Sequence, residues 1–332
     1  MLKDPFHIDV VISWVDGKAA KHEKKIQSYI DKEVNNNSHG IKKTRFKSIN
    51  EIEYCVLSIL KFAPFVKNIF IVTDNQDPKI FNAVKTNFPE RFTNVKIIDH
   101  KEIFENYERF LPVFNSRSIE SMIWRIKDLS NNFVYFNDDF FIIIPIKISD
   151  WFINGNPVLR GNWKLAPKKQ IKWIALSEKI RNYFSKEKKY SPKPNFYISQ
   201  WKAAKIIGFD NKFFRIEHTP HAINRKRLDF FFKKNKTLLE KNISYRFRNY
   251  SQFNTVALSN HLEIKKGNSN LEPPKAVYIY PIKRHKNYIK NKLEQCDKDL
   301  EMKFLCVQSL ERSSIQDQQK IMSWIKNRIL KK

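Results

Sequence analysis

Ten residues near the middle of the chain, FVYFNDDFFI at positions 133–142, are apolar except for one amide and two carboxylic acids. Runs of Phe, Val, Tyr and Ile of this kind are typical of strands that are buried on both faces, as in parallel sheets covered by helices. A carboxylate removed from water is costly unless a cation or several donors compensate it. The segment therefore predicts a buried strand that ends at a polar site formed by Asn137, Asp138 and Asp139.

Short apolar runs alternate with helical patterns over the first 145 residues. This alternation favours an α/β fold, with a mostly parallel twisted sheet and helices on both faces. A capping box from Ser48 to Glu51 is expected to open one helix, and Ser116 or Ser118 to cap another. We expect strands at 8–14, 68–73, 95–99 and 133–137. Helices are expected at 21–33 and 52–63, and two further helices are expected to end at about residue 87 and about residue 128.

Polar residues come directly after each expected strand. In parallel sheets, ligands bind beyond the carboxyl ends of the strands. We therefore expect these residues to gather around one site at that edge of the sheet. They are Asp16, then Asp74 with Asn75, then Asp99 with His100, and finally Asn137, Asp138 and Asp139.

Asp138 and Asp139 carry hard oxygen ligands of the kind that suit Mg²⁺ or Mn²⁺, with Asn137 in support. The alternative is that the two carboxylates cap the next turn and accept hydrogen bonds from backbone amides. Their apolar surroundings favour the metal. Asp16, directly before Gly17, is either a site residue or the start of a simple turn.

Two basic motifs lie in the second half of the chain. His218 and His221 in HTPH can be metal ligands, acid/base groups or phosphate donors, or simply part of a polar surface. Arg246 and Arg248 in YRFR share one face of an extended segment, and the arginine fork suits a phosphoryl group. The alternative is that each arginine is solvated.

The chain is strongly basic, since 62 lysine and arginine residues against 34 acidic ones give 332 residues a net charge of +28. Such an excess predicts polyanionic surroundings, which nucleic acid, an anionic membrane face or acidic glycans can provide. Three unevenly spaced cysteines predict neither a disulfide framework nor a zinc site and favour a reducing cytosol. The C-terminal residues 313–332 predict a basic amphipathic helix that either packs on the domain, as we favour, or lies on a membrane.

The N-terminal residues lack the apolar core of a signal peptide, and no apolar run is long enough to span a bilayer. We therefore expect a cytoplasmic protein, either free or held peripherally at the inner face of the cytoplasmic membrane. One domain is expected over 1–312. It would consist of an α/β half (1–145), a variable insertion (151–200) and a second half that completes the site (201–312).

Several motifs, taken in order, resemble the Stealth family of bacterial capsular polysaccharide phosphotransferases, to which the animal N-acetylglucosamine-1-phosphotransferase is related. The similarity covers most of the chain except 151–195 and the extreme C-terminus. The segments that carry it are IDVVISWVDG (8–17), RFKSINEIEYCVLSILKFAPFVKNIFIVTDNQDP (45–78), LPVFNSRSIESMIWRI (111–126), FVYFNDDFF (133–141), HTPHAINR (218–225), YRFR (245–248) and, more weakly, KFLCVQSLE (303–311).

The resemblance implies a nucleotide-sugar-transferase core, GT-A-like or Rossmann-like, that moves a hexose-1-phosphate such as N-acetylhexosamine-1-phosphate. The donor would be a UDP-sugar, the leaving group UMP, and the acceptor a hydroxyl of a glycan or lipid-linked glycan in capsule or lipooligosaccharide synthesis. Mg²⁺ or Mn²⁺ on Asp138 and Asp139 would neutralise the diphosphate. Arg248 would hold phosphoryl oxygens, and Asp16 or His218 would take the acceptor proton. The implied substrate-binding residues are Arg45, Asp74, Asn75, Asn115, Ser116, Glu120, Arg125, His221 and Arg246.

Two positions depart from the family pattern. Leu57 stands where the family usually has an arginine, and Gln308-Ser309 stands where it has Asn-Asp, so Gln308 and Ser309 are kept as site candidates. Two other functions stay open: a metal-dependent glycosyltransferase that releases UDP, and a basic polyanion-binding protein. The ordered carboxylates argue against the second, and no nucleic-acid partner is expected.

Overall fold

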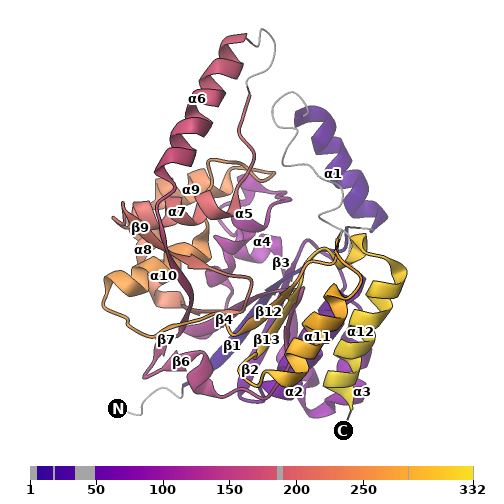
Figure 1. Ribbon diagram of the computed structural model, residues 1–332. Coiled ribbons are helices and arrows are strands. Elements are labelled where there is room, and N and C mark those ends of the chain that lie inside the picture. The colour runs from indigo at the N-terminus through magenta and orange to yellow at the C-terminus, as the bar shows by residue number, and fades with distance from the viewer. Residues whose placement is uncertain (1–5, 18, 34–48, 185–189, 283, 332) are drawn as a thin grey trace.

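A five-stranded sheet runs through the centre of the protein (Figure 1). The structure is a computed structural model that describes residues 6–17, 19–33, 49–184, 190–282 and 284–331. Four strands of the sheet are parallel, and the edge strand β10 is antiparallel to β4. In spatial order the strands are β3 (Val95–Asp99), β2 (Val66–Thr73), β1 (Ile8–Ser13), β4 (Asn132–Asn137) and β10 (His221–Asn224).

Both faces of this sheet are buried, which explains why its strands carry short apolar runs such as 10–12 and 69–72. Val10 and Ile12 of β1 point into one core, whereas Val11 points into the other. The first core is covered by α2 (Glu51–Phe62), α3 (Phe81–Asn87), α11 (Tyr288–Lys298) and α12 (Ile315–Leu330). The second is covered by α5 (Ser116–Glu120), α8 (Arg225–Lys234), α9 (Lys236–Ile243) and α10 (Thr255–Lys265).

A second sheet of three strands continues directly from the first. Its order is β12 (Ala276–Ile279), β13 (Phe304–Val307), β5 (Phe140–Ile142), with β5 antiparallel to β13. Only Asp138 and Asp139 separate the end of β4 from the start of β5. The chain therefore passes from one sheet to the other through the two carboxylic acids, and the backbone N–H of Val307 donates to the carbonyl oxygen of Asp139 at 3.1 Å.

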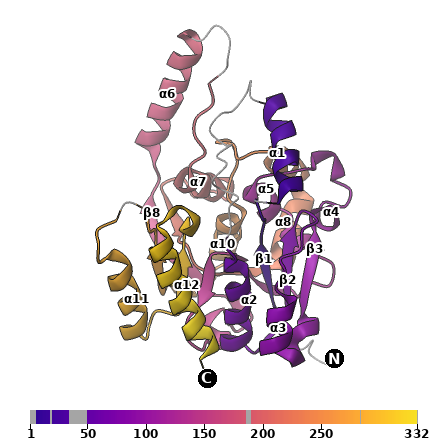
Figure 2. The same ribbon diagram turned by 90° about the vertical axis from the view of Figure 1, so that its right-hand side faces the viewer.

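A third sheet is formed by β9 (Lys212–Ile216), β8 (Leu159–Leu165) and β11 (Leu271–Glu272). Two helices, α1 (Ala20–Glu33) and α6 (Lys168–Phe184), project from the same end of the molecule (Figures 1 and 2). The remaining elements are α4 (His100–Ile103), β6 (Phe152–Ile153), β7 (Asn156–Pro157) and α7 (Phe196–Ile206).

The expected α/β fold with a mostly parallel sheet is confirmed. Each of the four expected strands begins and ends within two residues of its predicted limits. Two predicted helix caps are wrong. The residue before α5 is Asn115, whose side chain accepts the N–H of Arg117, and α5 ends at Glu120, well before position 128. The helix α2 begins at Glu51 itself and follows Asn50, which has a left-handed backbone (φ 73°) and no side-chain cap, while Ser48 lies outside the described residues.

The C-terminal helix α12 packs on the domain, as we favoured. Its apolar face, formed by Ile321, Ile325 and Ile329, is buried against the first core. The ammonium group of Lys61, at the end of α2, donates to the carbonyl oxygens of Ile329 and Lys331 at 2.6 and 2.8 Å. Among the helices of the described residues, none has the length and apolar character that crossing a membrane requires.

Replacing Ile325 with alanine should lower the free energy of unfolding by about 2–5 kcal/mol, because it leaves a cavity between α12 and the first core. The matched control is Ile315→Ala on the same helix, where the side chain is 71% exposed and the expected change is within about 0.5 kcal/mol. Urea denaturation measures both. Equal, small losses for the two variants would show that α12 is not packed as described.

Candidate active site

A cleft of about 640 Å³ opens at the carboxyl ends of β1 and β4. The order of the central sheet runs from β1 through β2 to β3 in one direction and then returns to place β4 on the other side of β1. The carboxyl ends of two such strands diverge and leave a crevice, which is where open α/β sheets bind ligands. Ser13 of β1 pairs in register with Asn137 of β4, and both residues line the cleft.

Carboxylates gather on one wall of the cleft. Asp138 and Asp139 lie between β4 and β5, Glu51 is the first residue of α2, and Glu311 comes from the segment after β13. We call these four residues the acidic corner. Burial, the charge of Asp139 and the charge of Glu51 raise the pKa of Asp138 well above its ordinary value. Burial and the charge of Glu51 likewise raise the pKa of Asp139 to about 7.

The carboxylate oxygens of the acidic corner are suitable ligands for a divalent cation. The Asp139 Oδ1 atom is buried without a hydrogen-bond partner. Over the described part of the chain, no group of three or more His, Cys, Asp or Glu side chains is already arranged to hold a metal. Magnesium commonly uses only one or two protein carboxylates and takes its other ligands from water and substrate phosphates. Asp138 and Asp139 therefore suit an ion that arrives with a diphosphate.

A second wall of the cleft carries Arg248 and α5. The Arg248 Nη2 atom donates to the hydroxyl of Ser116 at 2.6 Å. Burial raises the pKa of the nearby Glu120, while the positive charge of Arg248 opposes this rise. The hydroxyl of Tyr135 donates to Asn137 Oδ1 at 2.9 Å and lies 3.5 Å from Glu120 Oε1. Polar contacts thus lead from Arg248 to Asn137, which directly precedes Asp138 in the chain.

His218 lines the cleft between two aromatic rings. Its imidazole stacks on Phe196 and Tyr278, with ring centroids 5.2 and 5.0 Å apart. Burial and the positive charges of Arg215 and Arg248 lower the pKa of His218, so the ring is neutral at pH 7 and has a lone pair that can accept a proton. The flanking rings fix its plane.

His221 also lines the cleft, as do Gln308 and Ser309, the two residues that depart from the family pattern. The His221 Nε2 atom lies 3.1 Å from the carbonyl oxygen of Glu217, and burial lowers its pKa to about 3. The amide oxygen of Gln308 accepts a hydrogen bond from the hydroxyl of Tyr278. Ser309 has a left-handed backbone, with φ of 59°. Leu57, by contrast, is buried in the first core on α2.

Several predicted site residues do not line the cleft. The backbone of Asp16 exchanges hydrogen bonds of 2.9 and 2.8 Å with the side chain of Gln76. Asp74 forms an ion pair with Lys25 at 2.7 Å, and Asn75 is an exposed residue with a left-handed backbone. These contacts join loops at the carboxyl ends of β1 and β2 instead of reaching into the cleft.

Two predicted arginines are also engaged elsewhere. Arg125 donates to the carbonyl oxygens of Ile103 and Glu105 at 2.7 and 2.8 Å. Arg246 donates to the carbonyl oxygen of Pro112 at 3.0 Å and lies over the ring of Tyr29. Neither arginine is among the residues that line the cleft, and their role in substrate binding stays a prediction. Arg45 lies outside the described residues.

The structure brings other residues to the cleft that the sequence did not single out. Glu51 was interpreted only as part of a helix cap, and Glu311 as part of a weak motif. Both reach the cleft because α2 and the segment after β13 meet beside Asp138. Other lining residues of this kind are Trp14, His22, Arg117, Phe196, Glu217, Asn254 and Arg312, whereas His100 lines the cleft as the sequence predicts.

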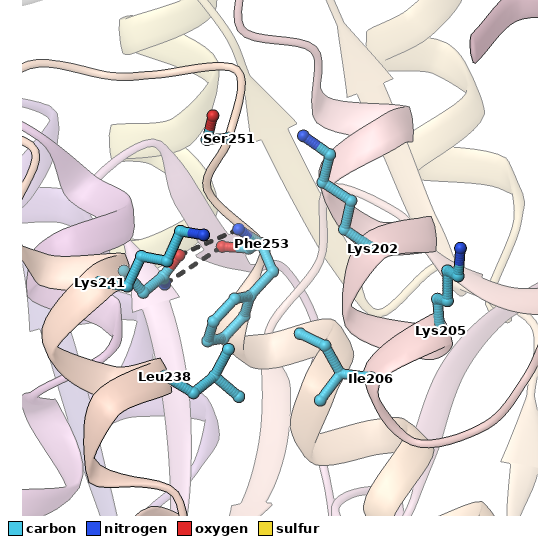
Figure 3. Close-up of a pocket in the computed structure, with 8 residues that line it drawn as sticks. Lys202, Lys205, Ile206, Leu238, Lys241, Ser251 and Phe253 are labelled. Atoms are coloured by element: carbon cyan, nitrogen blue, oxygen red, sulfur yellow. Dashed lines mark hydrogen bonds between the residues drawn. The ribbon is translucent and has the colours of Figure 1, made fainter. Parts of the chain in front are cut away.

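A smaller cavity of about 360 Å³ lies between α7 and α9 (Figure 3). Figure 3 shows Lys202 and Lys205 on one side and Lys241 on the other, above Ile206 and Phe253. Its described lining includes no carboxylate or imidazole, so it offers no anionic ligand for a metal. The 640 Å³ cleft has both and is the candidate active site.

Comparison with known proteins identifies related sequences. The family model described as Stealth protein CR2, conserved region 2, matches residues 45–158, which contain Asn137, Asp138 and Asp139. A capsular polysaccharide phosphotransferase of Haemophilus influenzae is 42% identical over 153 residues, which cover 46% of this chain and 39% of that protein. The capsular polysaccharide phosphotransferase LcbA of Neisseria meningitidis is 39% identical over 148 residues, which cover 45% and 38%.

A longer match is the receptor polysaccharide phosphotransferase WefC of Streptococcus oralis, 29% identical over 81% of each chain. The chain spans about two fifths of the length of the two capsular relatives. Among solved structures, the galactosyltransferase LgtC with donor and acceptor sugar analogues covers 96% of this chain and 95% of its own, with 10% identity and a TM-score of 0.46. The bifunctional glycosyltransferase WbbM covers 99% and 51%, with 12% identity and a TM-score of 0.47.

Without divalent cations, Asp139→Asn should raise the midpoint of thermal unfolding near about pH 8 and change it little near about pH 4. The pKa of Asp139 is about 7 in the folded protein and about 3.9 in an unfolded chain, so the folded state binds more protons between these values. Wild-type stability therefore falls as the pH rises through this window, and the neutral amide escapes that loss.

Calorimetry in the presence of a chelator measures the effect, with the exposed Asp210→Asn as the matched control. An Asp139→Asn effect that is the same at both pH values would exclude a raised pKa as its cause.

Proposed function

We propose that the chain is a member of the Stealth family and that it transfers a hexose-1-phosphate, such as N-acetylhexosamine-1-phosphate, from a UDP-sugar to a hydroxyl group of a glycan. UMP is the other product. The relatives that are named phosphotransferases of capsular and receptor polysaccharides support this assignment. The observation that carries it is the placement of an acidic corner and Arg248 on two walls of one cleft at the switch point of the sheet.

The proposed reaction is a substitution at phosphorus. The acceptor hydroxyl oxygen forms a bond to the β-phosphorus of the UDP-sugar, and the bond from that phosphorus to the oxygen bridging the two phosphates breaks. The electron pair leaves with UMP, and the hydroxyl proton passes to a base. Catalysis of such a step depends mainly on positioning and on stabilising charge at the phosphoryl oxygens.

Arg248 is suited to hold the phosphoryl group that is transferred. Its guanidinium is fixed on one side by the hydroxyl of Ser116, which lies at the start of α5. The remaining donors of its planar fork can bind two phosphoryl oxygens at once. An arginine held in this way loses little side-chain freedom when the donor binds, because one hydrogen bond already orients it.

His218 is the proposed acceptor of the hydroxyl proton. Its low pKa keeps the imidazole neutral, and the rings of Phe196 and Tyr278 orient it within the cleft. Asp16, the other base considered, is not among the residues that line the cleft, so we assign the proton to His218. Glu120 contacts the side chain of Ser116 and the hydroxyl of Tyr135, and in this way it positions Ser116 beside Arg248.

Mg²⁺ or Mn²⁺ is the proposed cofactor, held by Asp138 and Asp139 with Asn137 orienting them. When bound, the ion would neutralise charge on the diphosphate of the donor. The raised pKa values of both carboxyl groups support this assignment, because a nearby cation would relieve the repulsion among Asp138, Asp139 and Glu51. The acceptor is proposed to be a glycan or lipid-linked glycan of a bacterial surface polysaccharide, at the cytoplasmic side of the membrane.

Arg248→Gln should lower kcat/KM on the order of 10²–10³-fold, because it removes a charge-assisted contact to the phosphoryl group. Arg109→Gln is the matched control, since Arg109 is exposed and pairs with Glu240 outside the cleft. The assay combines protein, Mg²⁺, UDP-sugar and acceptor, and chromatography identifies the nucleotide released. UDP in place of UMP would overturn the phosphotransferase assignment in favour of a glycosyltransferase.

Addition of Mg²⁺ or Mn²⁺ should stabilise the wild-type protein against heat, by about 2.7 kcal/mol at roughly 100 times the dissociation constant. Asp138→Asn/Asp139→Asn should abolish this gain, since amides are weaker ligands for hard cations. The control is Asp210→Asn, an exposed aspartate outside the cleft. An equal gain in the double variant would exclude the acidic pair as the metal site, whatever the nucleotide assay gives.

A further inference from the structure

The helix α6 stands apart from the body of the molecule. Figures 1 and 2 show it projecting from the end of the protein at which β1 and β4 finish. None of the 17 residues of α6 is buried. Ile171 packs against a small cluster that contains Trp201, Ala204 and Phe213. A helix of this length with so little core contact is marginal in water by itself, so its sequence should show what stabilises it.

An apolar stripe runs along the exposed side of α6. Its residues follow the three- and four-residue spacing that places side chains on one face of a helix. Each of these side chains is 49–84% exposed, although three of them are aromatic. The members of the apolar stripe are Trp173, Leu176, Ile180, Tyr183 and Phe184.

The rest of α6 is basic. Lys168, Lys172 and Lys179 fall beside one edge of the apolar stripe by helical spacing. Five lysine or arginine residues and one glutamate lie within α6, so five minus one gives this helix a charge of +4. The single acid, Glu178, lies near Lys202 and Tyr250 of the neighbouring segments. Ile171 and Ile174 are partly buried on the opposite face.

We propose that the apolar stripe of α6 inserts into the surface of an anionic lipid membrane. Helices that lie in a membrane interface combine Trp, Phe and Leu on one face with lysines at its border, as α6 does. The aromatic side chains suit the boundary between headgroups and acyl chains. The lysines complement anionic headgroups, and the overall charge of +28 adds longer-range attraction to the same surface.

The position of α6 relative to the cleft gives this contact a use. The chain returns from α6 to α7, whose first residue, Phe196, stacks on His218 and lines the cleft. The apolar stripe and the cleft therefore belong to the same end of the protein. If the proposed function holds, a lipid-linked acceptor can reach the cleft while its lipid stays in the membrane.

The C-terminal helix cannot provide the same contact in this fold. Ile321, Ile325 and Ile329 of α12 are buried against α2 and the first core. Their insertion into lipid would require α12 to leave the domain. The membrane-binding helix is thus assigned to α6, in the segment between the two halves of the active site.

The experiment compares binding of the full chain to vesicles by co-sedimentation. One set of vesicles contains phosphatidylglycerol and phosphatidylcholine, and the other contains phosphatidylcholine alone. We expect binding to the first set, weakened by salt and at least about tenfold weaker for Trp173→Ser/Ile180→Ser. The matched control is Leu300→Ser/Ile315→Ser, which removes two apolar side chains of similar exposure elsewhere on the surface and should bind as the wild type does.

Three results would overturn the proposal. They are absence of wild-type binding to anionic vesicles, equal binding by the α6 variant, and a wild-type dimer that the α6 variant converts to a monomer. The last result would assign the stripe to a second copy of the chain. Nucleotide release with a short water-soluble acceptor is expected to be unchanged in the α6 variant, so failure of membrane binding and failure of the proposed reaction are distinguished.

Discussion

The passage of the chain from β4 to β5 is the constraint on which the rest of the site depends. β4 is held between β1 and β10 in the central sheet, and β5 is held against β13 in the second sheet. Two residues connect these strands, so the backbone of Asp138 and Asp139 is held at both ends. Their carboxylates stay at the junction of two sheets, where burial and like charges oppose ionisation. The two carboxylates repel each other because the connection from β4 to β5 places them side by side, and a bound cation would relieve this repulsion.

The central sheet could be predicted from the sequence because its strands carry a local signal. Apolar runs such as 10–12 and 133–136 favour burial on both faces, and the polar residues after them mark the edge where ligands bind. Asn137, Asp138 and Asp139 were found in this way, and the structure places His218 and Arg248 in the same cleft. The roles of these residues stay predictions.

The rest of the site could not be predicted, since it depends on contacts between distant segments. Glu51 and Glu311 are ordinary acidic residues in the sequence, and they face Asp138 only because α2 and the segment after β13 pack together. Asp74, Arg125 and Arg246 had the right chemistry at plausible positions, yet their partners in neighbouring loops hold them elsewhere. The exposure of α6 also had no local signal, because its apolar residues resemble those of a packed helix.

The left-handed backbone at Asn50 and Ser309 has a consequence for the acidic corner. These residues directly precede Glu51 and the segment that carries Glu311. For a residue other than glycine, this conformation costs roughly 1–2 kcal/mol, with asparagine the more tolerant of the two. The strained backbone therefore lies next to the two residues, Glu51 and Glu311, that complete the acidic corner. A glycine at 309 would relieve it and would also let the backbone turn away, so the strained serine fixes a direction that a relaxed chain would lose.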